Sequence, residues 1–537
     1  MVSRSLRAFP PGLLLALTAA LGCSRPPNLV IISVDTLRAD AIRQTDTPNL
    51  DRLAAAGTSF ETAVAPIPRT TPALASMLTG LEPGRHGSRE VGDPIHGNVT
   101  TLAEMLRDAG YSTFAVSANL SAGRGQGLDR GFDRFIGYND LIDIYNDEIY
   151  RDLTPVLPDH PGWAEALTDQ ALAMLDRVDS DRPYFLWVFY FDPHFMYRPP
   201  SPWQDRTDGD ACWQLYEDFT PRRHQAGQIF FNVGGVAERA NDACRRLYHA
   251  EVAYTDHEIG RLLAALRQRG DTTNTIVVFT ADHGENFGEG DLWFEHGDNA
   301  HDAALLVPLT VAGPGIARGR LTKQLATLAD LTPTLLTRLG QEAPGRVKFD
   351  GIDLGPWLGD PDLASTDRIV FAESATPIWN EAVNHVITGR VGGRTCINGP
   401  RFSLCADQRH HPGVVWLFDH QADPAFERNV AAEHPEAVAE LQRAWKRWPP
   451  ETARERVART TRYKLVERPQ LDGSYTRILI DLARDPEELT DVSNLVPDEF
   501  ERLRSALEAW TSTLPPLGDR EFDPKVEELL RELGYVS

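Results

Sequence analysis

Four apolar runs, separated by helical segments, constrain the fold of this chain more than any other feature of its sequence. Most are near-continuous stretches of β-branched and aromatic residues, which is typical of parallel strands that are buried on both faces. The runs cover residues 28–35, 111–117, 184–192 and 275–282, and helical segments lie at 100–109, 163–178 and 244–269. This alternation predicts an α/β fold with a large, doubly wound, mostly parallel sheet.

Polar side chains follow each run at the point where the strand should end. They are Asp35, then Ser117 and Asn119, then Asp192 and His194, and finally Asp282 and His283. Ligands of open α/β sheets bind beyond the carboxyl ends of the strands, where residues distant in sequence meet. We therefore expect these acidic, amide and imidazole groups to form one site.

The segment 70–80 adds hydroxyl groups at a predicted helix start. Pro72 suits the first turn of this helix, and Gly80 suits its C-terminal end. Either Thr70 or Thr71 suits the N-cap. Because the N-terminus of a helix favours anions, the segment predicts a hydroxyl group where an anionic group can bind.

The first 22 residues are interpreted as a secretory signal of the lipoprotein type. Two arginines precede an apolar run that is too short to span a bilayer of roughly 30 Å, and the Ala-Leu-Gly-Cys stretch ending at Cys23 resembles a bacterial lipobox. The alternative is ordinary cleavage that leaves Cys23 as a free thiol. We expect an exported protein of the bacterial cell envelope, held at the periplasmic face or the outer membrane only by lipidation of Cys23.

Four further cysteines suit an oxidising compartment. An even number in an exported protein is typical of disulfides, and the pairs nearest in sequence are Cys212–Cys244 and Cys396–Cys405. Three connectivities are possible, and four unpaired structural thiols are the alternative. Because no Cys-X-X-Cys motif surrounds these residues, a zinc site built from them is not expected.

The charge of the chain excludes one class of partner. Lys and Arg number 54 and Asp and Glu number 77, so the net charge is −23, which repels nucleic-acid backbones. An anionic substrate would need a local source of positive charge, and a metal ion is the simplest one.

Several motifs, in their order and spacing, resemble those of the sulfatases within the alkaline phosphatase superfamily. They are Asp35-Thr36-Leu37-Arg38, Thr47-Pro48-Asn49, the segment 70–80 with Arg85-His86-Gly87, Asp192-Pro193-His194, Asp282-His283-Gly284-Glu285 and Val307-Pro308-Leu309. The resemblance covers nearly the whole mature chain and implies an alkaline phosphatase-like catalytic domain over residues 28–365. It also implies a metal-dependent hydrolase that acts on anionic esters.

The resemblance implies a role for each site residue. Asp35, Thr70, Asp282 and His283 would bind one divalent cation, which is most often Ca²⁺ in this family and could be Mn²⁺, Mg²⁺ or Zn²⁺. Thr70 would be the nucleophile. The remaining contacts to the ester would come from His194 at the leaving group, His296 as a second imidazole, and Asn119 at a nonbridging oxygen.

The nucleophile position departs from the sulfatase pattern. Sulfatases have Cys or Ser there, followed by an Arg, because that residue is converted to formylglycine; this chain has Thr70 and Leu74. No formylglycine is therefore expected. The chain also has Thr36 where many sulfatases carry a second Asp. Since formylglycine releases sulfate through its geminal hydroxyl group and threonine has none, the chemistry favours phosphoryl or phosphonyl esters.

The substrate predicted from these observations is a small anionic ester or an envelope glycan or lipid. Two alternatives remain open: a transferase that moves a phospholipid headgroup onto an envelope glycan, and a non-catalytic binding lipoprotein that retains the fold. The segment 197–234, rich in Trp, Asp and Arg, is expected to overhang the pocket and set its specificity.

The sequence changes character beyond about residue 365. Two segments there resemble each other, 417–424 and 479–486, since each reads Leu-X-Asp followed by Asp-Pro. Each precedes a helical stretch, at 434–446 and 498–511. We expect a smaller α+β domain over 366–515 and a tail helix within 516–537.

Overall fold

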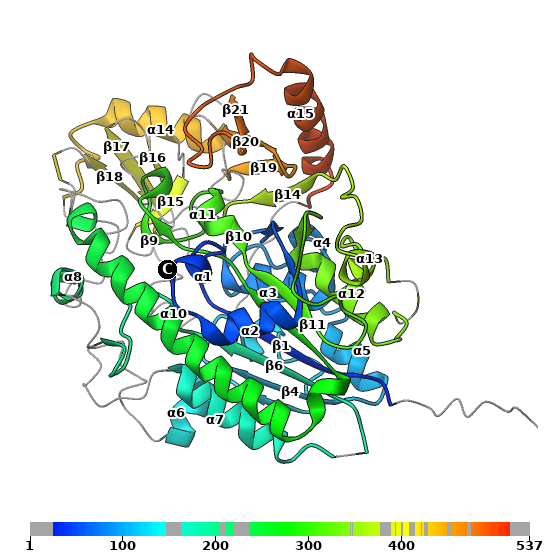
Figure 1. Ribbon diagram of the computed structural model, residues 1–537. Helices are drawn as coiled ribbons and strands as arrows, with labels where there is room; N and C mark the ends of the chain where they lie inside the picture. The colour runs from blue at the N-terminus through cyan, green and yellow to red at the C-terminus, as the bar shows by residue number, and fades with distance from the viewer. Residues whose placement is uncertain are drawn as a thin grey trace, which may run out of the picture.

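The computed structural model gives the arrangement of most of the chain (Figure 1). It describes residues 25–145, 163–179, 181–204, 210–219, 236–343, 345, 347–375, 388–391, 394–398, 401–406, 414–419, 422–423, 428–447, 454–469 and 474–515. The predicted signal segment with Cys23, the predicted tail helix and much of the segment 197–234 lie outside the described residues.

An eight-stranded sheet forms the centre of the molecule, in the order β12-β2-β11-β7-β1-β6-β4-β5. The four predicted strands lie side by side in it as β7 (Thr275–Ala281), β1 (Asn28–Val34), β6 (Tyr184–Tyr190) and β4 (Ser112–Ser117), and all their pairings are parallel. The other strands are β2 (Gly57–Phe60), β5 (Arg134–Ile136), β11 (Leu309–Ala312) and β12 (Arg320–Thr322). Since only β11 pairs antiparallel with its neighbours, the sheet is mostly parallel, as predicted.

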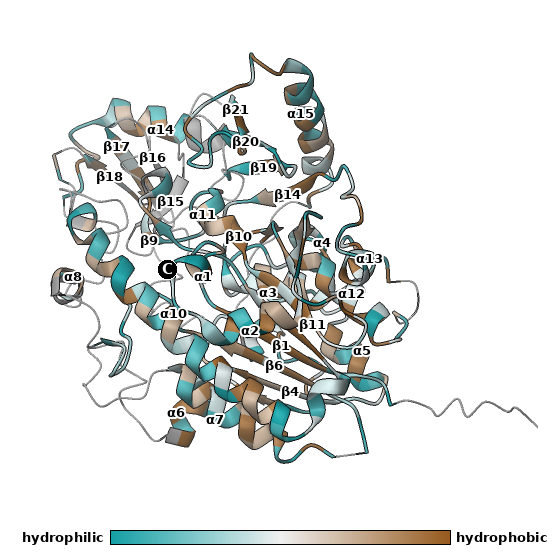
Figure 2. Cartoon of the chain, in the orientation of Figure 1, coloured by the Kyte–Doolittle hydropathy of each residue, from teal (hydrophilic) through white to brown (hydrophobic). Residues whose placement is uncertain are grey.

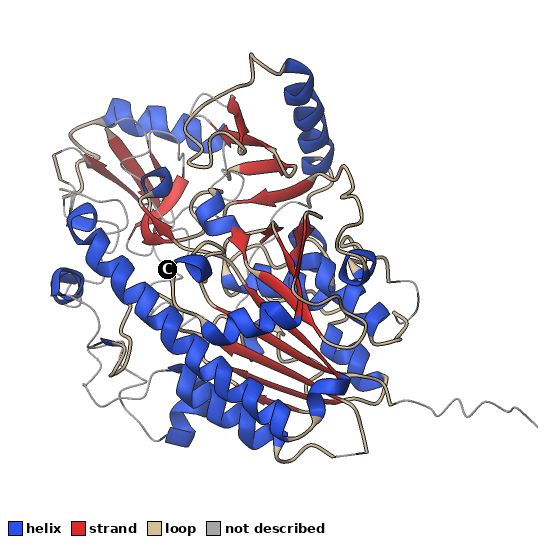
Figure 3. Cartoon of the chain, in the orientation of Figure 1, coloured by secondary structure: helices blue, strands red, loops and turns tan. Residues whose placement is uncertain are grey.

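Helices cover both faces of this sheet, so it is doubly wound (Figures 1 and 3). One face carries α2 (Pro48–Ala56), α7 (Trp163–Leu175) and α10 (Val236–Gln268), and the other carries α3 (Thr70–Thr79), α5 (Leu102–Asp108) and α12 (Leu331–Arg338). The three helices predicted between the strands are present as α5, α7 and α10. The last begins well before the predicted residue 244, because Ala237, Ala240 and Ala243 extend its buried face at helical spacing.

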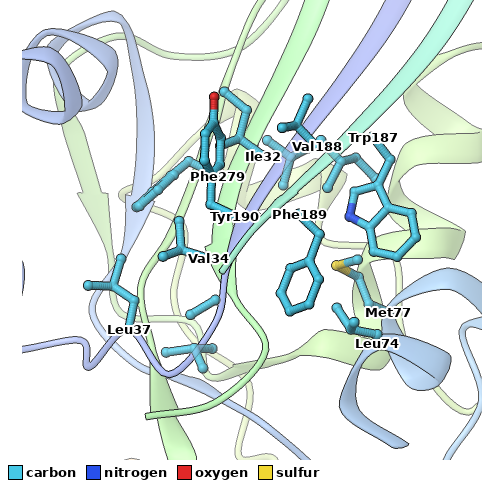
Figure 4. Packing of buried hydrophobic residues seen from close by; sticks show 14 of the residues in the cluster. Ile32, Val34, Leu37, Leu74, Met77, Trp187, Val188, Phe189, Tyr190 and Phe279 are labelled. Atoms are coloured by element: carbon cyan, nitrogen blue, oxygen red, sulfur yellow. The ribbon is translucent and has the colours of Figure 1, made fainter. Parts of the chain in front are cut away.

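The core lies where the sheet meets these helices. Every residue of β1 and β6 is buried, and Figure 2 shows the central strands in the hydrophobic colour. Figure 4 shows aliphatic and aromatic side chains of β1 and β6 packed together with Leu74 and Met77 of α3. All ten residues of α3 are buried. A helix that is enclosed on all sides holds its first residue, Thr70, in a rigid setting.

Two smaller sheets occupy the region beyond residue 365. One contains β14 (Val370–Glu373), β19 (Arg456–Arg459), β20 (Tyr463–Pro469) and β21 (Tyr475–Asp481) and packs against α15 (Pro497–Thr511). The other contains β15 (Thr388–Val391), β16 (Arg394–Asn398), β17 (Phe402–Ala406) and β18 (Val415–Asp419) and packs against α14 (Pro435–Arg447). The two similar sequence segments begin in β18 and β21, the last strand of each sheet, and α14 and α15 match the predicted helices. This region is the expected smaller, strand-rich part, and its boundary at 366 stays a prediction.

Short elements complete the described chain. They are α1 (Ala41–Gln44), β3 (Ala63–Val64), α4 (Pro83–His86), α6 (Tyr138–Tyr145), α8 (Asp210–Phe219), β8 (Asn286–Phe287), β9 (Trp293–Glu295), α11 (Asp302–Leu305), β10 (Leu306–Val307), β13 (Ala326–Thr327) and α13 (Gly355–Gly359). Within the described ranges, no helix has both the length and the apolar character that crossing a bilayer requires.

One predicted disulfide is confirmed. Cys212 of α8 is bonded to Cys244 of α10, with the two Cα atoms 5.0 Å apart. Cys405 is also disulfide-bonded, and Cys396 lies directly opposite it in the ladder between β16 and β17. The side chain of Cys396 is outside the described part. The Cys396–Cys405 disulfide therefore stays a prediction, and the register of β16 and β17 is consistent with it.

Candidate active site

The site lies at the carboxyl edge of the central sheet, where the sequence predicted it. Asp35 directly follows β1 and Asp282 directly follows β7, and these strands are in register through Val34 and Ala281. Asn119 lies two residues beyond β4. The parallel strands β7, β1 and β4 therefore bring residues from three distant parts of the chain to one edge of the sheet.

Three side chains offer donor atoms for a metal ion. One donor atom each from Asp35, Asp282 and His283 lies within 4.8 Å of the others. Nε2 of His283 is 3.3 Å from Oδ2 of Asp282 and 3.9 Å from Oδ1 of Asp35. Nδ1 of His283 lies 3.0 Å from the carbonyl oxygen of Gly284 and donates to it. The neutral ring therefore directs the lone pair of Nε2 towards the two carboxylates.

The unpaired oxygens of this group indicate what belongs there. Oδ1 of Asp35 and Oδ2 of Asp282 are buried without a hydrogen-bond partner, although the other oxygen of each carboxylate is bonded. Burial raises the pKa of Asp35 well above its ordinary value, and nearby Asp282 raises it further. Burial also raises the pKa of Asp282 to about 7. Two buried carboxylates with facing lone pairs, beside an imidazole nitrogen, fit a divalent cation.

Thr70 is the hydroxyl group of this cluster. Its Oγ1 is 3.4 Å from Nε2 of His283, and the residue is only 4% exposed. The structure thus brings together all four residues expected to bind the cation: Asp35, Thr70, Asp282 and His283.

The predicted threonine cap of α3 is wrong. Arg69 occupies the N-cap position, and no side chain there bonds to the first turn. The hydroxyl group of Thr71 donates instead to the carbonyl of Ser121 and accepts from the amide of Gly92. These tertiary bonds replace the local cap. The predicted end at Gly80 is confirmed, since Gly80 has a left-handed backbone with φ of 70° and donates to the carbonyl of Ser76.

Two further imidazoles lie beside the donor group. The ring centroid of His296 is 4.2 Å from that of His283 and 5.4 Å from that of His194. Nδ1 of His194 lies 2.7 Å from the carbonyl oxygen of Phe195, and burial lowers the pKa of His194 to about 4. Burial, with the positive charge of Arg69 adding to it, also lowers the pKa of His296. Both rings are therefore neutral at pH 7 in the metal-free chain, and each can offer a ring nitrogen to a substrate.

Asn119 contacts the donor group directly. Its Nδ2 donates to Oδ2 of Asp35 at 2.5 Å, and its Oδ1 accepts from the amide of Ser121 at 2.7 Å. The residue thus orients a carboxylate. Its expected contact to a nonbridging oxygen of the substrate stays a prediction.

Thr36 does not belong to the donor group, although it follows Asp35. Its backbone is left-handed, with φ of 51°, which is strained for a β-branched residue. Its amide donates to Oδ1 of Asp282, and its hydroxyl donates to the carbonyl of Pro193. Thr36 therefore fixes the second carboxylate through its backbone rather than supplying a third one.

Two residues at the site had no role in the sequence-based prediction. Arg69 is buried next to Thr70 and pairs with Glu295 and Asp298. Oε1 of Glu285 lies 3.2 Å from Nδ1 of His296. Only their positions in the sequence could have indicated that they belong to the site: Arg69 adjoins the proposed nucleophile, and Glu285 lies just after two predicted metal ligands. Nothing in a local pattern distinguishes such residues from ordinary surface charges.

Comparisons with known proteins agree with the geometry. The sequence model of the Sulfatase family matches residues 27–341. Human arylsulfatase A is 30% identical over 470 residues, which cover 81% of this chain and 90% of that protein.

Solved structures also match. The phosphonate monoester hydrolase of Agrobacterium radiobacter has a TM-score of 0.63 at 21% identity, covering 91% of this chain and 95% of that one. The phosphonate monoester hydrolase of Silicibacter pomeroyi has a TM-score of 0.53 at 25% identity, covering 78% of this chain and 94% of that one. With residues 27–341 matched by the family model and human arylsulfatase A matched over 90% of its length, this chain belongs to the sulfatase family.

Proposed function

We propose that this protein, an ester hydrolase of the sulfatase family that acts on anionic esters, uses Thr70 as its nucleophile and prefers esters of phosphorus. The observation that carries the proposal is the position of the Thr70 hydroxyl group. It lies at the buried start of α3, beside two carboxylates and an imidazole that converge on one point. A threonine with only a structural role would not need unpaired buried carboxylate oxygens beside it.

Asp35, Asp282 and His283, completed by the oxygen of Thr70, would hold one divalent cation. Family membership favours Ca²⁺, and the imidazole also suits Mn²⁺ or Zn²⁺, with Mg²⁺ a further candidate. When bound, such a cation lowers the pKa of an attacking hydroxyl group and neutralises charge on the transferring group.

The side chains then divide the reaction between them. Oγ1 of Thr70 forms a bond to the central atom of the ester while the bond to the leaving oxygen breaks. Because Nδ1 of His194 donates to the carbonyl of Phe195, its Nε2 lone pair can take up the proton that the Thr70 hydroxyl group loses and pass it to the leaving oxygen. His296 contacts a nonbridging oxygen. Water then cleaves the ester on Thr70 and restores the hydroxyl group, so one water is consumed in each turnover.

The identity of the nucleophile supports phosphorus over sulfur. A phosphoryl or phosphonyl ester of threonine can be released by attack of water at phosphorus. A sulfate ester of threonine is harder to release, because threonine lacks the geminal hydroxyl group of formylglycine. The likeness to the phosphonate monoester hydrolase of Silicibacter pomeroyi, at 25% identity, supports the same choice.

A panel of substrates tests the proposal. Purified protein of known metal content would be assayed on an aryl sulfate, a phosphate monoester, a phosphodiester and a phosphonate monoester. We expect the phosphorus esters to react fastest. Thr70→Ala should reduce their turnover at least about 10³-fold, whereas Thr70→Ser, which keeps a hydroxyl group, should retain a substantial part of it.

Mass spectrometry of acid-quenched protein provides the direct evidence. A phosphoryl or phosphonyl group on the peptide that contains Thr70 is expected in the parent and not in Thr70→Ala. Unchanged turnover in Thr70→Ala would contradict the proposal. Headgroup transfer to a glycan without release of free product would favour the transferase, and absence of both turnover and bound metal would favour the binding protein.

We also propose that the protein is exported and anchored by a lipid on Cys23, where it meets a small anionic ester or an envelope glycan or lipid. The disulfide between Cys212 and Cys244 supports an oxidising compartment. Metabolic labelling with a fatty acid should mark the parent protein and not Cys23→Ser. Equal labelling of both proteins would contradict lipidation at Cys23.

A further inference from the structure

We propose that Arg69 is a positioning residue that fixes His296 relative to Thr70 through the carboxylates of Glu295 and Asp298. The inference rests on the proposed function, because it assigns the placement of one imidazole used in that reaction. Arg69 directly precedes Thr70, whereas His296 is distant in sequence and follows β9. An ion pair between Arg69 and Glu295, which directly precedes His296, therefore connects the backbone at Thr70 with the backbone at His296.

The link is a fork of two buried ion pairs. Nη1 of Arg69 lies 2.7 Å from Oε1 of Glu295, and Nη2 lies 3.0 Å from Oδ1 of Asp298. The side chains of Arg69, Glu295 and Asp298 are 3%, 10% and 2% exposed, so solvent screens these pairs little. The planar guanidinium presents its donors in a fixed geometry, and binding two carboxylates at once fixes the orientation of both.

The two carboxylates flank His296 in sequence, and one of them reaches its backbone. Oε1 of Glu295 accepts from the amide of His296 at 3.1 Å as well as from Arg69. Arg69, Glu295 and the His296 backbone therefore form one continuous chain of hydrogen bonds. Displacing the guanidinium would release the group that orients the His296 peptide.

Gly297 shows how closely the loop packs on Arg69. Its φ is +92°, and a Cβ atom at this position would lie 2.0 Å from Nε of Arg69. Any side chain here would collide with the guanidinium. On its other side, the carbonyl of Gly297 accepts from the amide of Ala375 at 2.8 Å. The loop is therefore held between the start of α3 and the end of β14.

The imidazole that this loop carries is also held at its ring. Nδ1 of His296 is 3.2 Å from Oε1 of Glu285, and the ring packs against that of His283, with the centroids 4.2 Å apart and the planes tilted by 32°. Glu285 sets the rotation of the ring, and Arg69 sets the position of its backbone. Since a displacement of about 1 Å can cost on the order of 100-fold in rate, both constraints are needed for an effective contact.

A double-mutant cycle tests the proposal on a phosphorus ester that the parent hydrolyses. We expect Arg69→Met to lower kcat about 10- to 100-fold with KM changed less than about threefold. His296→Ala should have a similar effect. Because both variants remove the same contact, the double variant should be little slower than either single variant. Arg69→Lys, which keeps the positive charge but lacks the planar fork that holds two donors at a fixed spacing, should be intermediate.

Arg89→Met is the matched control. Arg89 is also buried and binds both oxygens of Glu373, each at 2.7 Å, but it has no contact with the His296 loop among the described interactions. Arg89→Met should lower Tm as Arg69→Met does, while leaving kcat per folded molecule near that of the parent. Affinity for Mn²⁺ by calorimetry should change less than about threefold in Arg69→Met, because other bonds hold Asp35, Asp282 and His283.

Multiplicative losses in the double variant, or a loss in Arg69→Met no greater than in Arg89→Met, would overturn the proposal. So would loss of Mn²⁺ binding in Arg69→Met, since Arg69 would then act on the metal ligands. The cycle does not depend on the nucleophile. If Thr70→Ala kept full turnover while Arg69 and His296 remained coupled, the proposed function would fail and the positioning role would stand.

Discussion

The side-chain amide of Asn119 donates to Oδ2 of Asp35 at 2.5 Å and leaves the other oxygen of that carboxylate, Oδ1, buried without a partner. Oδ1 is the atom that lies 3.9 Å from Nε2 of His283. A single hydrogen bond from Asn119 thus decides which oxygen of Asp35 is offered to a cation. In metal sites, hydrogen bonds from outer residues orient the ligands in this way.

Asn119→Ala should therefore weaken binding of a divalent cation by about 10- to 100-fold, because the carboxylate of Asp35 loses its orientation. Calorimetric titration of metal-free protein with Mn²⁺ measures the effect. Asn49→Ala is a suitable control, since Asn49 makes the same kind of bond to Asp256 outside the site. Equal affinities in Asn119→Ala and Asn49→Ala would show that the bond does not orient a metal ligand.

Removing the metal should destabilise the protein more at pH 8 than at pH 5. Burial raises the folded-state pKa of Asp282 to about 7 in the metal-free chain, above the unfolded value. The metal-free protein therefore loses stability as the pH rises towards 7, because folding then buries a charged carboxylate. A cation at about 1,000 times its Kd contributes roughly 4 kcal/mol. Tm with and without a chelator at each pH measures this difference.

The same chelator experiment on Asp282→Asn provides the control. This variant removes the titrating carboxylate and a ligand together, so the chelator should shift its Tm little at either pH. If the chelator lowered the Tm of the parent equally at both pH values, the destabilisation of the metal-free protein would not come from the charging of buried carboxylates.

His86 should make the protein sensitive to acid. Its Nδ1 accepts from the amide of Ser88, and its Nε2 lies 2.9 Å from Oγ of Ser76. Burial lowers the pKa of His86 to about 3, below the unfolded value. The contribution of neutral His86 to the free energy of unfolding is fully present above pH 6.5. It is lost as the pH falls towards 3, and the loss is about 2 kcal/mol at pH 5. Denaturant unfolding from pH 7 to 5 should show a smaller loss in His86→Gln, and parallel losses in both proteins would contradict this.

Arg454 should contribute strongly to the free energy of unfolding, because it connects the region beyond residue 365 with the segment that contains Arg89 and Glu90. It is fully buried, donates to the carbonyls of Arg89 and Ser374, and pairs with Glu90. Arg454→Met would remove a charged partner of the buried Glu90 carboxylate and the donors to two buried carbonyls, which costs about 3–5 kcal/mol. Arg504→Ala removes exposed pairs with Glu501 and Glu508 and should lower the free energy of unfolding far less, because solvent screens exposed pairs. Similar losses of unfolding free energy in the two variants would refute this difference.

Much of the fold followed from local pattern. The apolar runs beginning at Asn28 and Tyr184 predicted β1 and β6 because strands buried on both faces need apolar side chains on both. The N-cap of α3 could not be predicted in the same way. Thr71 is a residue type that favours the N-cap position, but its hydroxyl group bonds to Ser121 and Gly92. Such tertiary bonds cannot be recognised from the local sequence.

By itself, the sequence determined that Asp35, Asp282 and His194 would follow three strands, since the strands and the polar residues after them are local features and parallel strands share a carboxyl edge. Only the tertiary structure decided that Asn119 would orient Asp35 and that Arg69 would pair with Glu295 and Asp298. Those partners are far apart in the chain. Their distances depend on how buried helices and loops pack against the sheet, which no periodicity in the sequence encodes.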